Sequence, residues 1–377
     1  MTIRKLCLVL ALMTQLGGAL VAVESEWKQQ LCAWFSLNDD TPSTPRLALR
    51  YQPDLSLAVA LGSRWKLDGE AALDIHAAGS APGWRSPDFS GEIKPYRLWL
   101  RLYSQRFEAR LGLQKINFGS ATVFRPLMWF DALDLRDPLQ ISYGVYGLLL
   151  RYYFKNNANL WLWGLYGNQG TKGWETRLTA EHTPEFGARF QAPLFSGEAG
   201  LTIHRRRLAP GGVDGESVRM SEERFALDGK WDLGIGLWVE SAFSRQDDPA
   251  GGVSWQRSSA LGIDYTYKLG NGLYLLAEQF FSQAAASPFA HGEGGLSLSA
   301  LQARYPLGLL DNLALVVYFD WRRNQAYSLA SWQRTYDRWQ FLLLAFWNPR
   351  QGPIIGVQSG NNTFSGRGFQ LMAIWNI

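Results

Sequence analysis

The chain has 377 residues, a formal net charge of +4 and 14% aromatic residues, with 17 Trp, 15 Tyr and 20 Phe. A charge this small gives no sign of nucleic-acid binding, and two cysteines, Cys7 and Cys32, do not make a disulfide framework. The aromatic load is large for a soluble chain and is typical of a β-barrel with membrane–water interfaces.

The first 22 residues have the features of a secretory signal peptide. Arg4 and Lys5 precede the apolar run Leu6–Met13, and small residues continue through Ala22. The apolar run is much shorter than the ~20 residues that a membrane-spanning helix needs. We therefore predict export and cleavage after Ala22, which removes two basic residues and no acidic one and lowers the net charge from +4 to +2.

Residues 23–45 are predicted to be an N-terminal periplasmic segment. Four apolar side chains fall on one helical face: Trp27, Leu31, Trp34 and Phe35. Ser25–Leu37 is thus either a short helix or a frayed terminus. The turn-rich stretch Asn38–Pro45 is predicted to be a linker.

From Arg46 to Ile377 apolar and polar residues alternate in strand after strand, with the period of two that gives a strand one apolar face. Sixteen strands are predicted over Leu55–Leu61, Trp65–Ala77, Pro95–Tyr103, Phe107–Asn117, Tyr143–Phe154, Ala158–Asn168, Pro184–Ala192, Gly197–Arg207, Glu222–Asp232, Gly236–Gln246, Trp255–Leu269, Leu273–Gln283, Leu296–Tyr305, Asn312–Arg323, Arg334–Trp347 and Arg367–Ile377. Arg46–Tyr51 and Pro353–Gln358 are candidates for two more.

The connections between these strands alternate in length. Tight turns are predicted near Ser104, Asn156, Pro193, Leu233, Gly270 and Pro306. Longer connections are predicted at Ala78–Lys94, Phe118–Ser142, Gln169–Thr183, Leu208–Ser221, Ala284–Gly295 and around Asn324–Gln333. A soluble sandwich with Greek-key connections has no reason to alternate in this way. The sequence therefore predicts an all-β fold, a transmembrane antiparallel up-and-down β-barrel of 16–18 strands over residues 46–377.

Phe118–Ser142 is the longest predicted connection, and it is apolar. Its clustered side chains, Phe124, Leu127, Met128, Trp129 and Phe130, are too apolar for a loop exposed to water. We predict that it folds into the barrel and narrows the bore. Its predicted constriction charges are Arg125, Asp131, Asp134, Arg136 and Asp137. The alternative is an external loop whose aromatic side chains contact lipid headgroups or a neighbouring subunit.

Strand parity also predicts which charges face the lumen. The pore-lining candidates are Arg97, Arg101, Glu108, Arg110, Arg151, Lys155, Arg189 and Arg206. Charges on the lipid face would cost ~2–4 kcal/mol for Arg or Lys near mid-bilayer, so the lumen is the cheaper location. An excess of basic groups favours anions. The alternative is that acids such as Asp228, Glu240 and Glu278 pair with these groups and leave no net field.

The segment Arg110–Pro138 resembles a block found in some Gram-negative porin-like proteins. The matching residues are Gly112, Gln114, Phe118, Gly119, Pro126, Asp134, Asp137 and Pro138. Leu113 stands where arginine is usual in that block. The last strand resembles the C-terminal strand that the barrel-assembly machinery recognises, with Ile377 in place of the usual aromatic residue. The resemblance implies a location in the outer membrane, in contact with its lipid and lipopolysaccharide, and names no substrate.

No catalytic motif stands out, and we expect the protein not to be an enzyme and to need no cofactor. The four histidines, His76, His182, His204 and His291, lack metal-ligand spacing. The leading hypothesis is a porin-like channel for small, anionic solutes. A non-conducting sleeve for a partner protein, such as an envelope cytochrome, is one alternative. A transporter of apolar molecules is another, indicated by inward-facing Leu149, Tyr153, Leu276 and Phe280. The sequence is compatible with a homo-oligomer and with a periplasmic partner protein, and it does not decide between them.

Overall fold

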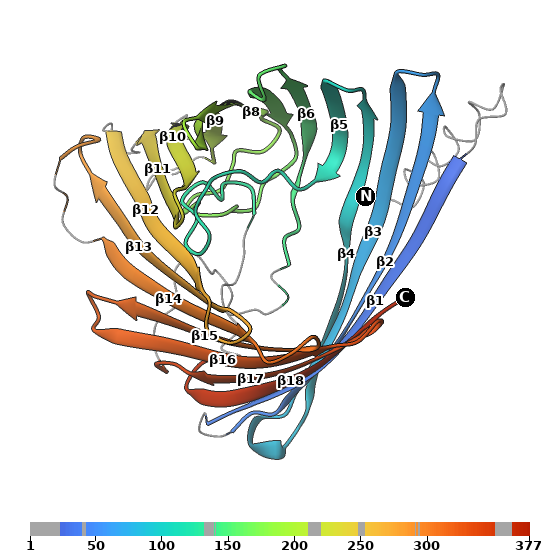
Figure 1. Ribbon diagram of the computed structural model, residues 1–377, viewed down its shortest axis with the longest axis vertical. Helices are drawn as coiled ribbons and strands as arrows, with labels where there is room; N and C mark the ends of the chain where they lie inside the picture. Colours follow the sequence, from blue (N-terminus) through green and yellow to red (C-terminus); the bar gives the residue numbers. More distant parts are fainter. Residues whose placement is uncertain are drawn as a thin grey trace, which may run out of the picture.

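The structure is a computed structural model that describes residues 23–39, 43–131, 139, 141–209, 220–247, 253–290, 292, 295–350 and 364–377. The described residues form an 18-stranded antiparallel sheet wound into a barrel (Figure 1). Its strands are β1 (Val23–Asn38), β2 (Arg46–Leu61), β3 (Trp65–Ser80), β4 (Asp88–Tyr103), β5 (Phe107–Gln114), β6 (Val145–Tyr153), β7 (Asn159–Leu165), β8 (Glu185–Leu194), β9 (Gly197–Leu208), β10 (Met220–Asp232), β11 (Gly236–Asp247), β12 (Val253–Tyr267), β13 (Leu273–Ala285), β14 (Leu296–Pro306), β15 (Asp311–Asp320), β16 (Gln325–Thr335), β17 (Trp339–Trp347) and β18 (Arg367–Asn376).

Every strand pairs with its neighbours in the sequence, and β1 pairs with both β2 and β18. The sheet therefore closes on itself and has no free edge, the arrangement that satisfies strand backbone groups without water. The predicted all-β, antiparallel, up-and-down barrel is confirmed, at the upper end of the predicted strand number. No helix among the described residues is long and apolar enough to cross a membrane.

Both alternatives for Ser25–Leu37, a short helix and a frayed terminus, are wrong, because these residues belong to β1. The helical pattern placed Trp34 and Phe35 on one face, whereas the strand puts them on opposite faces. Trp34 packs with the interior residues Cys32 and Met372, and Phe35 contacts Phe369 on β18, with ring centroids 6.1 Å apart. The barrel therefore begins at Val23, not at Arg46.

A second correction concerns the strands near the C-terminus. Asn324–Gln333, predicted as a long connection, lies almost entirely in β16, and the predicted strand Arg334–Trp347 is divided between β16 and β17. The break comes at residues 336–338, where the chain turns. The candidate strand Pro353–Gln358 and the predicted signal peptide, residues 1–22, lie outside the described residues.

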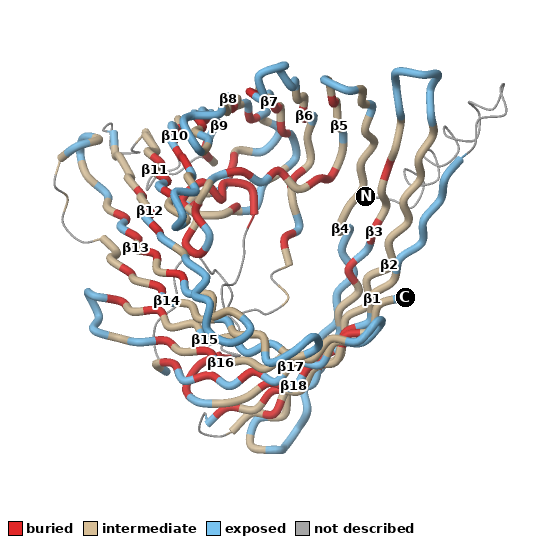
Figure 2. The backbone as a smooth tube through the Cα atoms, viewed as in Figure 1, coloured by how far each residue is buried: buried red, intermediate tan, exposed pale blue. Residues whose placement is uncertain are grey.

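The two faces of each strand differ as the alternation predicts. In β9, Leu201 and Ile203 are exposed, whereas Thr202, His204 and Arg206 are buried (Figure 2). Short turns join the strands at one end of the barrel. The connections at the other end, here called the loop end, are longer except between β15 and β16, where residues 321–324 form a short turn.

The seam between the first and last strands is closed at both ends. At the short-turn end, the amide N–H of Gln29 donates to the carbonyl of Ile377 at 3.1 Å, and that of Ile377 donates back at 2.9 Å. At the loop end, Asp39 accepts the Arg367 amide N–H at 2.8 Å. This hydrogen bond and the nearby Arg350 guanidinium hold the pKa of the Asp39 carboxyl below its usual range.

Candidate functional site

Two connections enter the barrel from the loop end (Figure 1). The first inward segment, residues 115–144, joins β5 to β6, and the second inward segment, residues 166–184, joins β7 to β8. The central part of the first segment is almost wholly buried, since Phe124 and Leu127 are each 1% exposed and Phe130 is 2% exposed (Figure 2). The barrel interior is therefore built from wall side chains and from these two segments.

Carboxylates of the wall hold the tip of the first inward segment. Glu278 on β13 accepts the amide N–H groups of Thr122 at 3.0 Å and Phe124 at 2.7 Å, and that of Val123 at 3.2 Å. Glu240 on β11 accepts the amide N–H groups of Ala121, at 2.8 Å, and Leu127. Hydrogen bonds to a charged group contribute ~1.5–3 kcal/mol each, so this carboxylate clamp fixes the backbone of the segment.

Apolar packing adds to the clamp. Phe124 contacts Phe280 of β13 and Tyr318 of β15, with ring centroids 5.4 and 6.0 Å apart. On the other side of the segment, Phe118 stacks on Trp163 of β7 at 5.5 Å. Full burial of a Leu or Phe side chain stabilises by ~1.5–3 kcal/mol, so several such side chains make the segment a permanent part of the interior.

The far part of the first inward segment contacts the opposite wall. Leu139 packs against the apolar cluster that Cys32 of β1 forms with Met372 and Ile374 of β18. The hydroxyl group of Tyr143 donates a hydrogen bond to the carboxylate of Asp74 on β3 at 2.6 Å. Burial raises the pKa of this hydroxyl group. The described parts of the segment thus contact two separate sectors of the wall, β11–β15 through residues 121–127 and β18–β3 through residues 139 and 143.

The second inward segment packs directly against the first. Trp174 donates its indole N–H to the carbonyl of Arg125 at 2.9 Å and stacks on Phe280 at 5.0 Å. Gly173 lies against the carbonyl of Met128 so closely that a Cβ atom there would stand 1.7 Å from that oxygen.

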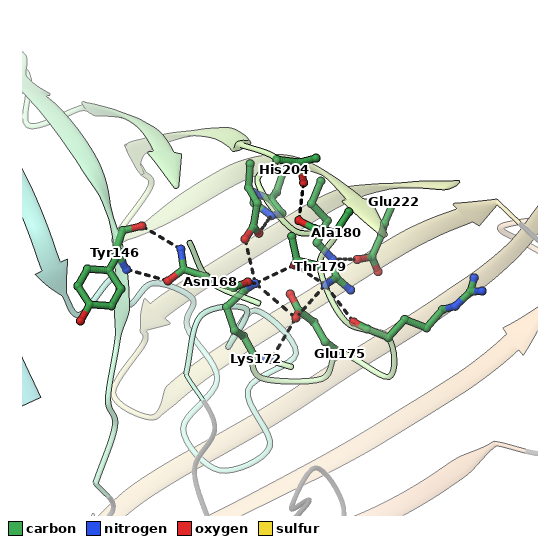
Figure 3. A network of polar contacts seen from close by, with 12 residues as sticks. Tyr146, Asn168, Lys172, Glu175, Thr179, Ala180, His204 and Glu222 are labelled. Atoms are coloured by element: carbon green, nitrogen blue, oxygen red, sulfur yellow. Dashed lines mark hydrogen bonds and ion pairs between the residues drawn. The ribbon is translucent and has the colours of Figure 1, made fainter. Parts of the chain in front are cut away.

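A network of buried charges fixes the second segment to β8–β10 (Figure 3). Arg206 and Arg224 share two carboxylates: Glu175 of the segment, whose oxygens lie 2.9 Å from each guanidinium, and Glu222 of β10. Lys172 lies 3.0 Å from Glu185, which in turn lies 3.2 Å from His204. Each charge of this network thus has a partner of opposite sign, as burial requires.

The wall of β2–β7 is different, because its arginines are only partly buried and lie beside aromatic rings. Arg110 lies over Trp99 at 4.6 Å and Arg151 over Trp161 at 3.8 Å. Both arginines approach the single carboxylate of Glu108, at 2.9 and 3.7 Å. Here we define the arginine wall as Arg50, Arg97, Arg101, Arg110 and Arg151, each of which lies over an aromatic ring.

Two further members of the arginine wall, Arg101 and Arg97, have partners other than Glu108. Arg101 pairs with Asp68, with its Nε 2.9 Å from the carboxylate. Arg97 donates to main-chain carbonyls of the first inward segment, Ser142 at 3.0 Å and Tyr143 at 3.3 Å. The return of the first segment is thereby attached to the arginine wall.

The predicted pore-lining residues fall into three groups. Arg97, Arg101, Glu108, Arg110 and Arg151 belong to or touch the arginine wall. Arg189 and Arg206 are 2% and 1% exposed and are occupied by internal ion pairs, Arg189 with Asp228 at 2.6 Å. Lys155 lies in the exposed turn between β6 and β7.

Of the predicted constriction charges, Arg125 is half-buried beside Asn117, and Asp131 is 2% exposed. Asp134, Arg136 and Asp137 lie outside the described residues. The sequence interpretation missed the second inward segment, because "TKGWETRLTAEHT" is polar and matches an ordinary external loop. Trp174, an isolated tryptophan in that stretch, was the one available signal.

The described residues contain no group of three or more His, Cys, Asp or Glu side chains placed to hold a metal ion. A hollow of about 730 Å³ lies at the short-turn mouth, lined among others by Gln191, Lys230 and Asp264.

No protein-family model matches the sequence, and no curated protein matches it. Solved structures do resemble the fold. An anion-selective porin from Comamonas acidovorans is 14% identical with a TM-score of 0.51, and the match covers 94% of this chain and 100% of the porin. OccK7 (OpdD) of Pseudomonas aeruginosa is 10% identical with a TM-score of 0.53, covering 94% of this chain and 99% of the other. OmpT, an outer-membrane protein of Vibrio cholerae in a trimer form, is 12% identical with a TM-score of 0.51, covering 94% and 100%. At these identities the likeness concerns the fold, an 18-stranded barrel similar to those of outer-membrane porins.

Proposed function

We propose that the protein is a porin-like channel of a Gram-negative outer membrane that passes small solutes through a bore narrowed by the two inward segments. The observation that carries this proposal is the fixed course of the first inward segment, held by Glu240 and Glu278 on one wall and by Asp74 and Arg97 on the other. A loop anchored to two sectors of a barrel wall restricts passage without needing to move. The signal peptide and assembly through β18 by the barrel-assembly machinery are part of the same proposal.

The interior argues against the two other functions. Of the four inward apolar residues that suggested an apolar substrate, Leu149, Leu276 and Phe280 are at most 2% exposed because side chains of the inward segments and the wall cover them. The fourth, Tyr153, is 37% exposed and lies at the end of β6, away from these three. A sleeve for a partner protein needs an empty interior, whereas described residues of the two inward segments fill part of this one.

An anion preference is the finer part of the proposal. Two arginines of the arginine wall, Arg110 and Arg151, share the one carboxylate of Glu108. Their Nε atoms make no hydrogen bond in the described structure. These Nε atoms are buried, so the support for an anion preference is the excess of positive charge that two guanidinium groups leave beside one carboxylate. Charged groups at a constriction set the selectivity of a pore.

The test is the conductance of the purified protein in a planar lipid bilayer, with the reversal potential measured under a KCl gradient. We expect conducting channels that prefer chloride, and a reduced preference in the double variant Arg110→Gln, Arg151→Gln. The control Arg322→Gln changes an exposed arginine between β15 and β16 and should leave the reversal potential unchanged. Properly folded protein that never conducts would overturn the channel. Conducting variants with an unaltered reversal potential would overturn only the role of the two arginines.

A further inference from the structure

Charged side chains gather on the outer face of the barrel at one place, the loop ends of β9–β12. The outward positions of β9 run through Leu201 and Ile203 to Arg205 and Arg207, while the residues between them are buried. The same change from apolar to charged occurs on β10, where Phe225 is followed toward the loop end by Glu223. These charges therefore face away from the lumen.

The strand register places four arginines in one small patch. Arg205 is opposite Glu223, and Glu223 is opposite Arg245 of β11. Arg207 lies two residues along β9 from Arg205, and Arg257 of β12 is opposite Phe243. Neighbouring strands lie ~4.8 Å apart, so the patch is about 15 Å wide. We call Arg205, Arg207, Arg245 and Arg257 the outer arginine patch.

The outer arginine patch is not neutralised within the described structure. Glu223 is 3.7 Å from Arg205 and 3.6 Å from Arg245, and Asp247 is 3.9 Å from Arg245, so these ion pairs are long. They are also exposed, with 71% of the Arg205 side chain open to solvent. Exposed pairs of this kind contribute ~0–1 kcal/mol, so the guanidinium groups are available for a stronger partner.

Directly below the patch, toward the short-turn end, the outward residues of β9 and β10 are apolar. On β11 and β12 the next row holds Phe243 beside Arg257, and Ser241 and Ser259 follow. Ile203 is 44% exposed and Phe225 is 49% exposed. Phe289, from the connection between β13 and β14, is 78% exposed and reaches the outer side of β11, where its ring lies 6.0 Å from that of Phe243. Basic groups thus lie above an apolar surface along the same strands, an arrangement that fits an amphipathic ligand.

We propose that the outer face of β9–β12 binds a phosphorylated membrane lipid of the lipopolysaccharide type. Its headgroup phosphates would contact the outer arginine patch and its acyl chains would lie on Ile203, Phe225 and Phe243. Guanidinium groups bind phosphate oxygens through paired charge-assisted hydrogen bonds, and the patch offers four of them. The proposal rests on the proposed function insofar as the barrel must lie in a membrane with its loop ends at the outer leaflet.

The binding test uses the purified full chain in detergent and titrates it with diphosphoryl lipid A, dephosphorylated lipid A and inorganic phosphate. The variant Arg205→Gln, Arg245→Gln, Arg257→Gln should lose about tenfold or more in affinity for diphosphoryl lipid A. Glu223→Gln, which removes a competing carboxylate, should raise that affinity. The control is again Arg322→Gln, a loop-end arginine outside the patch, whose affinity should equal that of the unmodified protein.

The outcomes show which part of the lipid the protein recognises, its phosphates or its acyl chains. Equal affinity for lipid A with and without phosphates would overturn the role of the arginines, and affinity for inorganic phosphate equal to that for lipid A would overturn a lipid site. An unchanged affinity in the triple variant would likewise overturn the proposal. The conductance of the same preparations tests the channel independently of the lipid site, because the outer arginine patch faces away from the bore. A protein that binds lipid A but does not conduct would retain the lipid site and lose the channel.

Discussion

Glu222 and Glu223 are neighbours in β10, and their side chains point to opposite faces of the sheet. They therefore allow a buried carboxylate to be compared with an exposed one in the same strand. Glu222 is 2% exposed and lies between Arg206 and Arg224 in the buried network. Glu223 faces outward, and its ion pairs with Arg205 and Arg245 are 3.6–3.7 Å long. A charge left alone inside a protein is far more costly than one left alone at a wet surface.

Glu222→Gln should therefore lower the free energy of unfolding by about 3–5 kcal/mol, because two buried guanidinium groups would share the remaining Glu175. Glu223→Gln should change it by less than about 1 kcal/mol. Denaturant unfolding of both variants in lipid vesicles measures the difference. Similar losses for the two variants would show that the buried network does not stabilise the barrel.

At the scale of the elements, the two inward segments support each other through a contact that needs glycine. Gly173 has φ +49° and no room for a Cβ beside the Met128 carbonyl, whereas Gly167, in the same connection, has φ +81° and open space around it. Both positions favour glycine, so an alanine costs backbone strain of ~1–2 kcal/mol at either. Only at Gly173 does it also push the segments apart.

Gly173→Ala should accordingly expose the first inward segment to protease, whereas Gly167→Ala should leave it as resistant as in the unmodified protein. Limited proteolysis from the loop side, read by mass spectrometry of the fragments, makes the comparison. Equal protection in both variants would contradict the mutual support of the two segments.

The elements also show what alternation in the sequence can and cannot predict. A period of two over Leu261–Tyr265 identifies a strand and its outward face, as the exposure of Leu261, Ile263 and Tyr265 bears out. In β1 the same alternation was present, but Trp34 and Phe35 also fitted a helical face, and only pairing with β2 and β18 decides between the two. The pairing with β18 joins residues more than three hundred positions apart, which no local pattern contains.

On the scale of the whole molecule, the barrel and an apolar connection inside it could be predicted, but the contacts in the interior could not. Parity placed Glu240 and Glu278 on the inner face, yet it could not reveal that they bind backbone N–H groups of residues 121–127. Likewise, Arg206 was predicted to line the pore, but Glu175 covers it, because the polar second inward segment turns inward. The interior is therefore asymmetric, with packed segments against β7–β15 and the arginine wall opposite.

The central claim is that the first inward segment sets the bore, and single-channel conductance tests it most directly. A variant with Thr122–Arg136 replaced by a short Gly/Ser linker retains every strand of the barrel. Heat-modifiable migration on a gel verifies that it has folded. We predict that this variant conducts more than the unmodified protein, because the inward segment is gone. A folded variant whose single-channel conductance equals that of the unmodified protein would contradict the claim.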